Sequence, residues 1–450
     1  MRLFGTDGIR GEVGKYPLTA ENILKLAKAA SLVLKKKNSI SRVVINKDTR
    51  LSGYIFEPTL TAGFISMGVN VVLVGPLPTP ALTILSKSLR ADFSVMITAS
   101  HNPFQDNGLK FFSGTGYKIT AEEERKIEDY FFNYDFDNFK IKPSNYGKAV
   151  RLKDAIGRYS EALKQNTFKN LDYTKLKVVL DCANGAAYKV APEVLFEIGV
   201  ELDTLGDKPN GTNINEKCGS LFPERASKLV KKRKSDVGIC LDGDGDRLII
   251  IDEKGEPIFG EELIYILAKY YLKNKNIKKG STIVTNEIAN FGLDVSLKKI
   301  GLKLKRVKVG DKNILQEIRT NGHYFGGEPS GHFIFKDDTL IGDGMSTALR
   351  VLTIMLKENK KLSELKKGLD LLQVVEINQR IDREKFFQNE AKIYRDLNSL
   401  LKSKNLFYVV RPSGTEPLLR VNLQYQPRNI KVSDLRKLQK NIIDIITNAC

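Results

Sequence analysis

Residues 175–187 read KLKVVLDCANGAA, a short apolar run rich in β-branched side chains that ends in a glycine-containing turn. Such a run is typical of a strand that is buried on both faces of a parallel sheet. The theme of apolar strand, glycine-rich turn and helical pattern recurs along the chain, for example in DVGICLDGDGDRLIIID at 236–252. Because strands alternate with helical patterns, we expect an α/β protein.

Two helix starts are predicted from side chains that can cap a first turn. Thr19 precedes a pattern in which apolar side chains recur on one helical face. Thr120 is followed three residues later by Glu123, which is the spacing of a capping box. We therefore expect helices to begin after Thr19 and after Thr120.

The region after residue 370 differs from the rest of the chain. VVEINQRI, FYVVRPSG and LLRVNLQY read as strands separated by helical stretches, which predicts a small α+β domain with an antiparallel sheet. A chain of 450 residues is also too long for one hydrophobic core, and the polar stretch at 140–148 is typical of a linker. We expect three α/β domains with mixed sheets and a smaller C-terminal α+β domain, with boundaries at 1–150, 151–255, 256–370 and 371–450.

The composition is that of an ordinary soluble protein, with 42% hydrophobic and 28% charged residues. No apolar segment approaches the roughly 20 residues that cross a bilayer, and the N-terminus MRLFGTDGIRG lacks the apolar core of a signal peptide. The four cysteines show no CxxC spacing, and Cys182 and Cys240 lie in apolar runs, which favours reduced, buried thiols. We expect a cytoplasmic location.

The formal net charge of +19 has two interpretations. One is nucleic-acid binding through phosphate contacts. The other is a lysine-rich surface whose positive field attracts a small anionic substrate. The densest basic runs, KKK at 35–37 and KKRK at 231–234, are short, far apart and not interleaved with aromatic side chains for base stacking. We therefore expect a small-molecule substrate, with neither nucleic acid nor a membrane as partner.

The strongest local signal for chemistry is LDGDGDR at 241–247. Asp242, Asp244 and Asp246 project to one side of an extended backbone, and the intervening glycines let the chain curl so that the three carboxylates converge. Three hard oxygen ligands suit Mg²⁺, which keeps positions open for phosphate or water. An EF-hand is excluded because its sixth position requires glycine and is Arg247 here. An acidic surface turn is the alternative.

Ser100 ends the strand-like run in SVMITASHNPFQDNGLKFF at 94–112. It can be a turn former, a protease-like nucleophile or the carrier of a transferred group. Adjacent side chains on an extended segment point to opposite sides, so His101 is expected to be poorly placed to activate Ser100, and no G-x-S-x-G elbow is present. Beside a metal loop, a serine suits the role of phosphoryl carrier. Lys110 can then act as general acid or base, or neutralise charge.

Three further motifs offer anion or sugar contacts. VVRPSGTEPLLRV at 409–421 places two arginines beside a Ser-Gly-Thr turn, which is what a phosphate dianion requires, although a plain hairpin is the alternative. GGEPSGHF at 326–333 offers a carboxylate, a hydroxyl and an imidazole to sugar hydroxyls; taken alone, it favours a loop-forming role. GTDGIRG at 5–11 offers backbone amides and Arg10, with a simple turn as the alternative.

Taken together and in this order, the motifs resemble the α-D-phosphohexomutase superfamily over essentially the whole chain. The resemblance rests on GTDGIRG, TASHNP with DNGLKFF, DCANGAAYKVAPE, PNGTNIN-x-x-CG, DGDGDR, VGD, GGE-x-SGH and RPSGTEPLLRV. GTDGIRG and NGTNIN-x-x-CG point to the branch that acts on glucosamine phosphates. Two positions depart from that branch: Pro329 stands where glutamine is common, and Lys312 stands where arginine is usual, which loses bidentate geometry.

The resemblance implies four domains around a central cleft and an isomerase of amino-sugar biosynthesis. It would interconvert glucosamine 6-phosphate and glucosamine 1-phosphate through a phosphoserine enzyme and a 1,6-bisphosphate intermediate, feeding UDP-N-acetylglucosamine and cell-wall synthesis. A glucose or mannose phosphate mutase of the same superfamily is the alternative. Hexose or glucosamine 1,6-bisphosphate is the implied activator. Monomer and homodimer are both open.

The resemblance also implies roles for individual residues. Ser100 would carry the phosphoryl group, and one Mg²⁺ would be held by its phosphate together with Asp242, Asp244 and Asp246. Lys110 and His101 would aid proton transfer and charge balance, and Arg247 would line the reacting centre. The implied substrate-binding residues are Arg10, Glu328, Ser330, His332, Arg411, Ser413, Gly414, Thr415 and Arg420. From other classes of protein, a metal-dependent phosphatase and a non-catalytic polyanion binder are the rivals.

Overall fold

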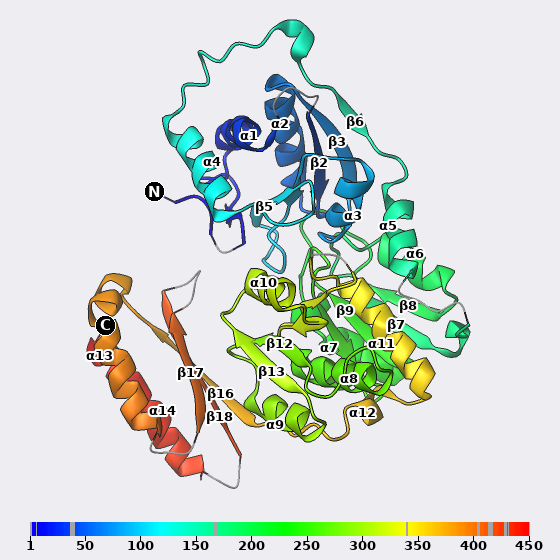
Figure 1. Ribbon diagram of the computed structural model, residues 1–450, viewed down its shortest axis with the longest axis vertical. Helices are drawn as coiled ribbons and strands as arrows, with labels where there is room; N and C mark the ends of the chain where they lie inside the picture. The colour runs from blue at the N-terminus through cyan, green and yellow to red at the C-terminus, as the bar shows by residue number, and fades with distance from the viewer. Residues whose placement is uncertain are drawn as a thin grey trace. The chain divides into compact units, whose positions relative to one another are not determined.

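The computed structural model describes most of the chain and divides it into two compact units. The first unit comprises Met1–Tyr270 and Gly310–Lys367, and the second comprises Tyr271–Val309 and Gly368–Cys450. The described residues are 2–5, 7–36, 41–165, 170–338, 341–402, 406–412, 417–426, 430 and 432–449. The ribbon alternates strands and helices through most of its length (Figure 1).

The first unit begins with a six-stranded mixed sheet. In spatial order its strands are β1 (Ile9–Glu12), β5 (Asp106–Ser113), β4 (Phe93–Ile97), β2 (Ser41–Lys47), β3 (Val69–Pro76) and β6 (Ala149–Arg151). β4, β2, β3 and β6 run parallel to one another, whereas β5 is antiparallel to both of its neighbours. The antiparallel β5 returns the chain past the end of β4, and Ser100 lies in the connection between these two strands.

Helices α1 (Ala20–Leu34), α2 (Gly53–Ser66) and α4 (Ala121–Asn133) contribute to one hydrophobic core with this sheet. Both predicted helix starts are confirmed. The Thr19 side chain accepts a hydrogen bond from the Asn22 amide at the start of α1. Thr120 and Glu123 form the capping box at the start of α4, which satisfies amides that a helix leaves without intrahelical partners.

The segment KLKVVLDCANGAA contains β7 (Lys177–Asp181), which lies between β9 (Val237–Leu241) and β8 (Glu201–Leu205) in a five-stranded mixed sheet. The order of strands is β11 (Pro257–Ile258), β10 (Leu248–Ile251), β9, β7 and β8. β7 is parallel to β8 and β9, as its apolar character predicts, while β10 turns back antiparallel to β9. The two glycine-containing turns that follow β7 and β9 therefore emerge side by side.

These two turns pack directly on each other. The Ala186 amide donates to the Gly243 carbonyl oxygen over 2.8 Å. A Cβ atom at Gly185 would lie 2.4 Å from that same oxygen, so only glycine allows this approach. The turn after β7 thus fixes the backbone on which the three aspartates sit.

The remaining elements of the first unit complete these layers. A hairpin of β14 (Phe325–Gly327) and β15 (Phe333–Phe335) carries the GGEPSGHF motif at its tip. The helices are α3 (Ala81–Ser88), α5 (Ala155–Lys164), α6 (Val190–Glu197), α7 (Glu224–Arg233), α10 (Asp311–Asn321), α11 (Gly344–Glu358) and α12 (Leu362–Leu365). Helix α8 (Gly260–Lys273) ends just beyond the first segment of this unit.

The second unit contains the predicted antiparallel sheet. Strands β16 (Gln373–Arg380), β18 (Leu418–Tyr425) and β17 (Phe407–Pro412) pair antiparallel, and α13 (Arg383–Lys402) and α14 (Val432–Ala449) share a hydrophobic core with them. The expected α+β character of the C-terminal region is confirmed. The same unit holds the parallel pair β12 (Thr282–Asn286) and β13 (Lys303–Val307) and helix α9 (Phe291–Lys299). The domain boundaries predicted from the sequence stay predictions.

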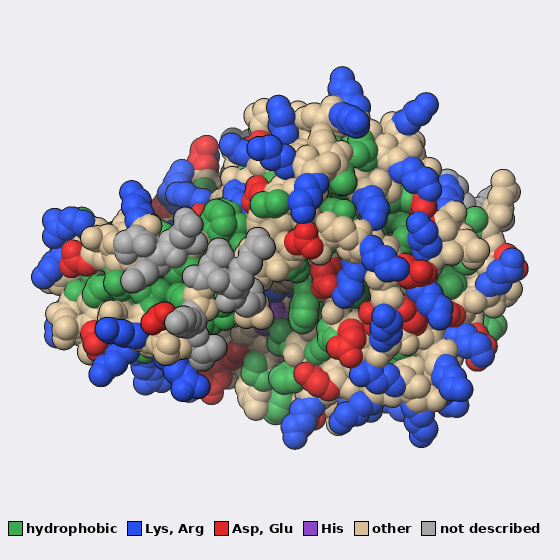
Figure 2. Space-filling view, turned by 90° about the horizontal axis from the view of Figure 1, so that it is seen from below, with side chains coloured by type: hydrophobic (Ala, Val, Ile, Leu, Met, Phe, Trp, Pro, Cys, Tyr) green, Lys and Arg blue, Asp and Glu red, His purple; other side chains and the backbone are tan. Residues whose placement is uncertain are grey.

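Lys and Arg side chains are scattered over the displayed face of the molecule rather than gathered into one patch (Figure 2). Cys182, Cys218 and Cys240 are buried and form no disulfide with one another. Within the part of the chain that the structure describes, no helix combines the length and the apolar character needed to span a bilayer.

Asp343 is a buried carboxyl group whose titration is expected to affect stability. It caps α11 by accepting from the Ser346 amide over 3.0 Å, and it accepts from the Tyr159 hydroxyl over 2.8 Å. Burial, reinforced by the nearby Asp338, raises its pKa to about 7 from 3.8. Between these two values the native state binds more protons than the unfolded chain, so the contribution of this group to stability falls as the pH rises toward 7.

Replacing Asp343 by asparagine is therefore expected to flatten this pH dependence. Asparagine keeps the cap and the acceptor for Tyr159 but does not ionise. The melting temperature of the variant should rise relative to that of the unsubstituted protein as the pH is taken from about 5 to about 8. Thermal unfolding at several pH values measures the difference. If the melting temperatures of the two proteins instead changed with pH by the same amount over this range, Asp343 would not titrate there.

Candidate functional site

Ser100 is held in an unusual backbone conformation by a buried arginine. Its φ of 52° lies in the left-handed region, which non-glycine residues rarely adopt. The Arg50 guanidinium, whose side chain is fully buried, donates to the carbonyl oxygens of Ser100 and Asn102 over 2.9 and 2.8 Å. The Asn215 amide group donates to the same two oxygens over 2.9 and 3.0 Å. The loop is thus positioned through its backbone, and the Ser100 hydroxyl stays available.

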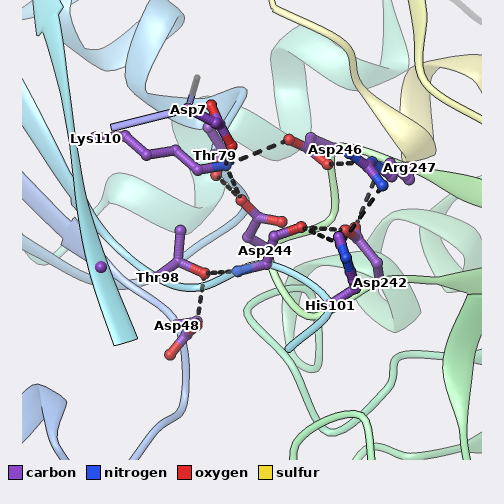
Figure 3. Close-up of polar contacts among 12 residues, drawn as sticks. Asp7, Asp48, Thr79, Thr98, His101, Lys110, Asp242, Asp244, Asp246 and Arg247 are labelled. Atoms are coloured by element: carbon purple, nitrogen blue, oxygen red, sulfur yellow. Dashed lines mark hydrogen bonds and ion pairs between the residues drawn. The ribbon is translucent and has the colours of Figure 1, made fainter. Parts of the chain in front are cut away.

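A second set of contacts, made by Asp48 and Thr98, also holds the loop that carries Ser100. Asp48 accepts from the Arg50 Nε over 2.8 Å and from the Thr98 hydroxyl over 2.6 Å (Figure 3). The Thr98 hydroxyl oxygen in turn accepts from the Ser100 amide over 2.9 Å. These hydrogen bonds connect the end of β2 to the end of β4 and fix the position of the serine.

The three aspartates predicted as metal ligands do converge. Asp242, Asp244 and Asp246 are buried, and one carboxylate oxygen from each lies within 4.8 Å of the others. The Ser100 hydroxyl donates to Asp242 Oδ2 over 2.8 Å, although 142 residues separate the two in sequence. The serine and the acidic loop therefore form one site.

The donor set fits a divalent cation. Within the described part of the chain, Asp244 Oδ1 and Asp246 Oδ1 are buried without a hydrogen-bond partner. Buried carboxylate oxygens in this state are costly unless an ion or water satisfies them. Thr79 fixes the other oxygen of Asp244, donating its hydroxyl to Oδ2 over 2.7 Å, so that Oδ1 is left to face the ion. Hard oxygen donors of this kind suit Mg²⁺.

Lys110 places a positive charge beside the aspartates. Its Nζ atom lies 2.8 Å from Asp244, 3.6 Å from Asp246 and 3.2 Å from Asp7. Burial alone would lower the pKa of this ammonium group, but the three carboxylates outweigh burial and raise the pKa above its ordinary value. Lys110 is therefore charged at neutral pH and can neutralise negative charge or donate a proton.

His101 lies closer to Ser100 than the sequence indicates. Its Nδ1 atom is 3.4 Å from the Ser100 Oγ and 3.5 Å from an Nη of Arg247. The expectation that His101 is poorly placed relative to Ser100 was wrong, because it assumed an extended backbone and the left-handed φ of Ser100 breaks the alternation of side chains. Burial, followed by Arg247 and Arg10, lowers the pKa of His101 to about 4, so its ring is neutral at pH 7.

The GGEPSGHF hairpin is joined to the metal loop through its backbone. Arg247 and His332 form an isolated antiparallel bridge, and the Leu248 amide donates to the Gly331 carbonyl over 3.1 Å. His332 Nδ1 lies 3.9 Å from Asp246 Oδ1. Ser330 donates to Glu328 over 3.4 Å. The structure thus places the predicted sugar-contacting residues beside the aspartates.

The remaining predicted anion contacts divide between the two units. Arg10 forms an ion pair with Asp7 in the first unit. In the second unit, Arg411 and Arg420 stand opposite each other on β17 and β18. Burial, and then the charge of Arg420, lowers the pKa of Arg411. Ser413, Gly414 and Thr415 lie outside the described residues.

Several residues of the site were missed by the sequence analysis. They are Asp7, Asp48, Arg50, Thr79, Lys118, Asn215 and Asp311. Asp7 and Asp311 lie inside motifs that were recognised, GTDGIRG and VGD, and attention to their charge could have found them. Thr79 and Lys118 carry no such signal, since they reach the site through contacts over 165 and 193 residues of chain.

Comparison with known proteins gives three family matches. The family models described as phosphoglucomutase/phosphomannomutase alpha/beta/alpha domains I, II and III match residues 1–138, 157–255 and 259–370. Proteins named phosphoglucosamine mutase are similar over nearly their whole length. One from Geobacter metallireducens is 47% identical, covering 95% of each chain, and one from Zymomonas mobilis is 46% identical, covering 93% of each.

Solved structures share the fold. A phosphoglucomutase/phosphomannomutase family protein from Burkholderia thailandensis matches with a TM-score of 0.80 and 24% identity, covering 99% of this chain and 97% of its own. The N-acetylphosphoglucosamine mutase of Aspergillus fumigatus, solved in complex with GlcNAc-6P and magnesium, matches with a TM-score of 0.65 and 17% identity, covering 100% of this chain and 96% of its own. The expected architecture of three α/β domains and a smaller α+β domain agrees with these matches.

Proposed function

Because the chain belongs to the phosphoglucomutase/phosphomannomutase family, we propose that it interconverts glucosamine 6-phosphate and glucosamine 1-phosphate. The observation that carries the proposal is the 2.8 Å contact between the Ser100 hydroxyl and Asp242, one of three converging buried aspartates. The name shared by relatives that are 44–47% identical supports the amino sugar as substrate. A glucose or mannose phosphate mutase is the alternative, which the departures at Pro329 and Lys312 keep open.

In the proposed reaction, phosphorylated Ser100 gives its phosphoryl group to the free 1- or 6-hydroxyl of the bound sugar phosphate. The bond between phosphorus and Ser100 Oγ breaks, a bond to the sugar oxygen forms, and the sugar hydroxyl loses its proton. Ser100 Oγ gains a proton as its bond to phosphorus breaks, so one proton passes in net from the sugar hydroxyl to the serine. His101 and Lys110 are proposed to aid this transfer, and the Lys110 ammonium to offset charge on the phosphoryl oxygens. The 1,6-bisphosphate then turns end for end and returns its other phosphoryl group to Ser100.

The proposed cofactor is one Mg²⁺, held by Asp242, Asp244, Asp246 and the phosphate on Ser100. When bound, it supplies positive charge that stabilises the transferring phosphoryl group. Lys110 and Arg247 add fixed positive charge around the same place, and burial of the site excludes water that would intercept the phosphoryl group.

The substrate contacts follow from the chemistry of a sugar phosphate. Glu328 and Ser330 are proposed to bind sugar hydroxyls, with His332 beside them and Arg10 as a further anion contact. Arg411 and Arg420, with Ser413, Gly414 and Thr415, are proposed to bind the phosphate that does not react. Glucosamine or hexose 1,6-bisphosphate is the proposed activator, because it can phosphorylate Ser100.

Mass spectrometry with a substrate panel tests the function. Incubation with Mg²⁺ and glucosamine 1,6-bisphosphate should add one phosphoryl group to the intact chain, and peptide mapping should place it on Ser100. Turnover should be faster on glucosamine 6-phosphate than on glucose 1-phosphate or mannose 1-phosphate. Release of free phosphate without isomerised sugar would instead identify a phosphatase, and a preference for glucose or mannose phosphates would identify the alternative mutase.

A further inference from the structure

Lys118 joins three segments of the first unit that are distant in sequence. Its Nζ atom lies 2.5 Å from Asp7 Oδ1, in the N-terminal segment, and 2.6 Å from Asp311 Oδ2, at the first position of α10. Lys118 itself lies between β5 and α4. Burial would lower the pKa of this ammonium group, but Asp311 and Asp7 outweigh burial and raise it, so the group keeps its charge. One cation thus ties two carboxylates together.

The first of these carboxylates, that of Asp7, also contacts Lys110 at the candidate metal site. Asp7 accepts from Lys118 through Oδ1, and its Oδ2 lies 3.2 Å from Lys110 Nζ (Figure 3). Lys110 in turn contacts Asp244 over 2.8 Å. Asp7 therefore helps to hold Lys110 against the metal loop, and a shift of Asp7 would disturb the position of Lys110.

The second carboxylate, that of Asp311, lies near the candidate metal site on the side of His332. Asp311 Oδ2 lies 4.0 Å from His332 Nε2, which accepts a hydrogen bond from the Gly342 amide over 3.2 Å, so the carboxylate is a charged neighbour of the ring rather than its hydrogen-bond partner. The Nδ1 atom of the same ring lies 3.9 Å from Asp246. The two partners of Lys118 thus reach two different aspartates of the candidate metal site, one through Lys110 and the other through His332.

The packing around Lys118 makes this tie important. A cavity of about 670 Å³ lies beside it, lined by Phe4, by Tyr117 and the first turn of α4, and by one face of α10. Side chains on opposite walls of this cavity do not touch across it, so polar contacts that span it help to fix α10 against the β5–α4 connection. Polar contacts described across this region include the Lys118–Asp311 ion pair and the Arg319 guanidinium 4.0 Å from the Tyr117 ring centroid.

We propose that Lys118 is a positioning residue for phosphoryl transfer, whose ammonium holds α10 and the N-terminal segment so that Lys110 and His332 keep their places at the three aspartates. The inference rests on the proposed function and deepens it. Lys118 does not touch the reacting atoms: it acts through Asp7 and Asp311. Its loss should therefore slow the chemical step more than it weakens binding of either the sugar phosphate or the metal.

The test compares Lys118→Met with Lys118→Arg and with Lys126→Met, a matched control. Lys126 forms an exposed ion pair with Glu122 over 2.6 Å on α4, away from the site. We expect kcat of Lys118→Met to fall about 100-fold, the effect of a small misplacement of reacting groups, with KM changed by less than about threefold. Mg²⁺ affinity, measured by calorimetry, should be unchanged. Lys118→Arg should recover most of kcat, since a guanidinium can hold two carboxylates, and Lys126→Met should behave as the unsubstituted protein.

A double variant tests the tie itself. Once Lys118→Met has released Asp311, adding Asp311→Asn should slow turnover little further, so the combined loss should be smaller than the product of the single losses. Multiplicative losses would overturn the proposal. So would a Lys118→Met protein with kcat within about threefold of the unsubstituted protein, or one whose Mg²⁺ affinity falls in step with kcat. If the unsubstituted protein isomerises no hexose phosphate, the proposed function fails instead.

Discussion

Replacing Ser100 by alanine is expected to abolish isomerisation of the sugar phosphate while leaving the fold intact. The variant lacks the only oxygen that this position offers to a phosphoryl group. Removal of an enzyme's nucleophile costs about 10⁴-fold or more in turnover, and a loss of that size is expected here. The fold should persist because Arg50 and Asn215 hold this loop through backbone carbonyls, which alanine retains. Steady-state rates and the thermal unfolding temperature measure the two effects.

Ser94→Ala provides the matched control for this prediction. Ser94 is a fully buried serine on β4, six positions before Ser100, and its hydroxyl has no hydrogen-bond partner among the described residues. Its replacement should leave turnover and phosphorylation unchanged. Intact mass after incubation with the 1,6-bisphosphate should show one added phosphoryl group in the control and none in Ser100→Ala. A phosphorylated and active Ser100→Ala protein would place the carrier elsewhere.

Much of the fold could be predicted because its determinants are local. The β-branched run before Asp181 specified a buried parallel strand, and Thr120 with Glu123 specified a helix start, since each depends on neighbours within a few residues. The convergence of Asp242, Asp244 and Asp246 was also predictable, because the three are close in sequence and the intervening glycines permit the turn in which they lie, with Gly245 at a φ of 68°.

The rest of the site depends on contacts that no local pattern encodes. Ser100 meets Asp242, and Lys118 meets Asp311, only because two sheets and a helix bring their connections together. His101 shows a subtler limit. The rule of alternating side chains failed there because Ser100 has a left-handed backbone conformation, which Arg50 and Asn215 stabilise. Such a conformation is usually indicated in a sequence by glycine, and none stands at this position.

The second large effect is expected when the metal site loses one ligand. In Asp244→Asn, an amide replaces a carboxylate whose Oδ1 atom is buried without a hydrogen-bond partner among the described residues. The amide carries no charge to bind a divalent cation. Its single oxygen, placed where Asp244 Oδ2 lies, can accept from the Thr79 hydroxyl and from Lys110 and so preserve the local fold. We expect Mg²⁺ affinity to fall by about 100-fold or more and turnover to fall with it. Chelation of divalent ions should likewise stop turnover of the unsubstituted protein.

Asp252→Asn is the control that distinguishes the loss of a metal ligand from the loss of any buried negative charge. Asp252 is as deeply buried as the ligands and follows β10, but its Oδ1 accepts from the backbone amides of Lys254 and Glu256, over 3.0 and 2.9 Å, which asparagine can also do. The control should therefore keep both its Mg²⁺ affinity, measured by calorimetry, and its turnover. If Asp244→Asn also bound Mg²⁺ with unchanged affinity, the acidic loop would not be the metal site. The contact between Ser100 and Asp242 would then be an ordinary hydrogen bond, and phosphoryl transfer at this serine would lose its physical basis.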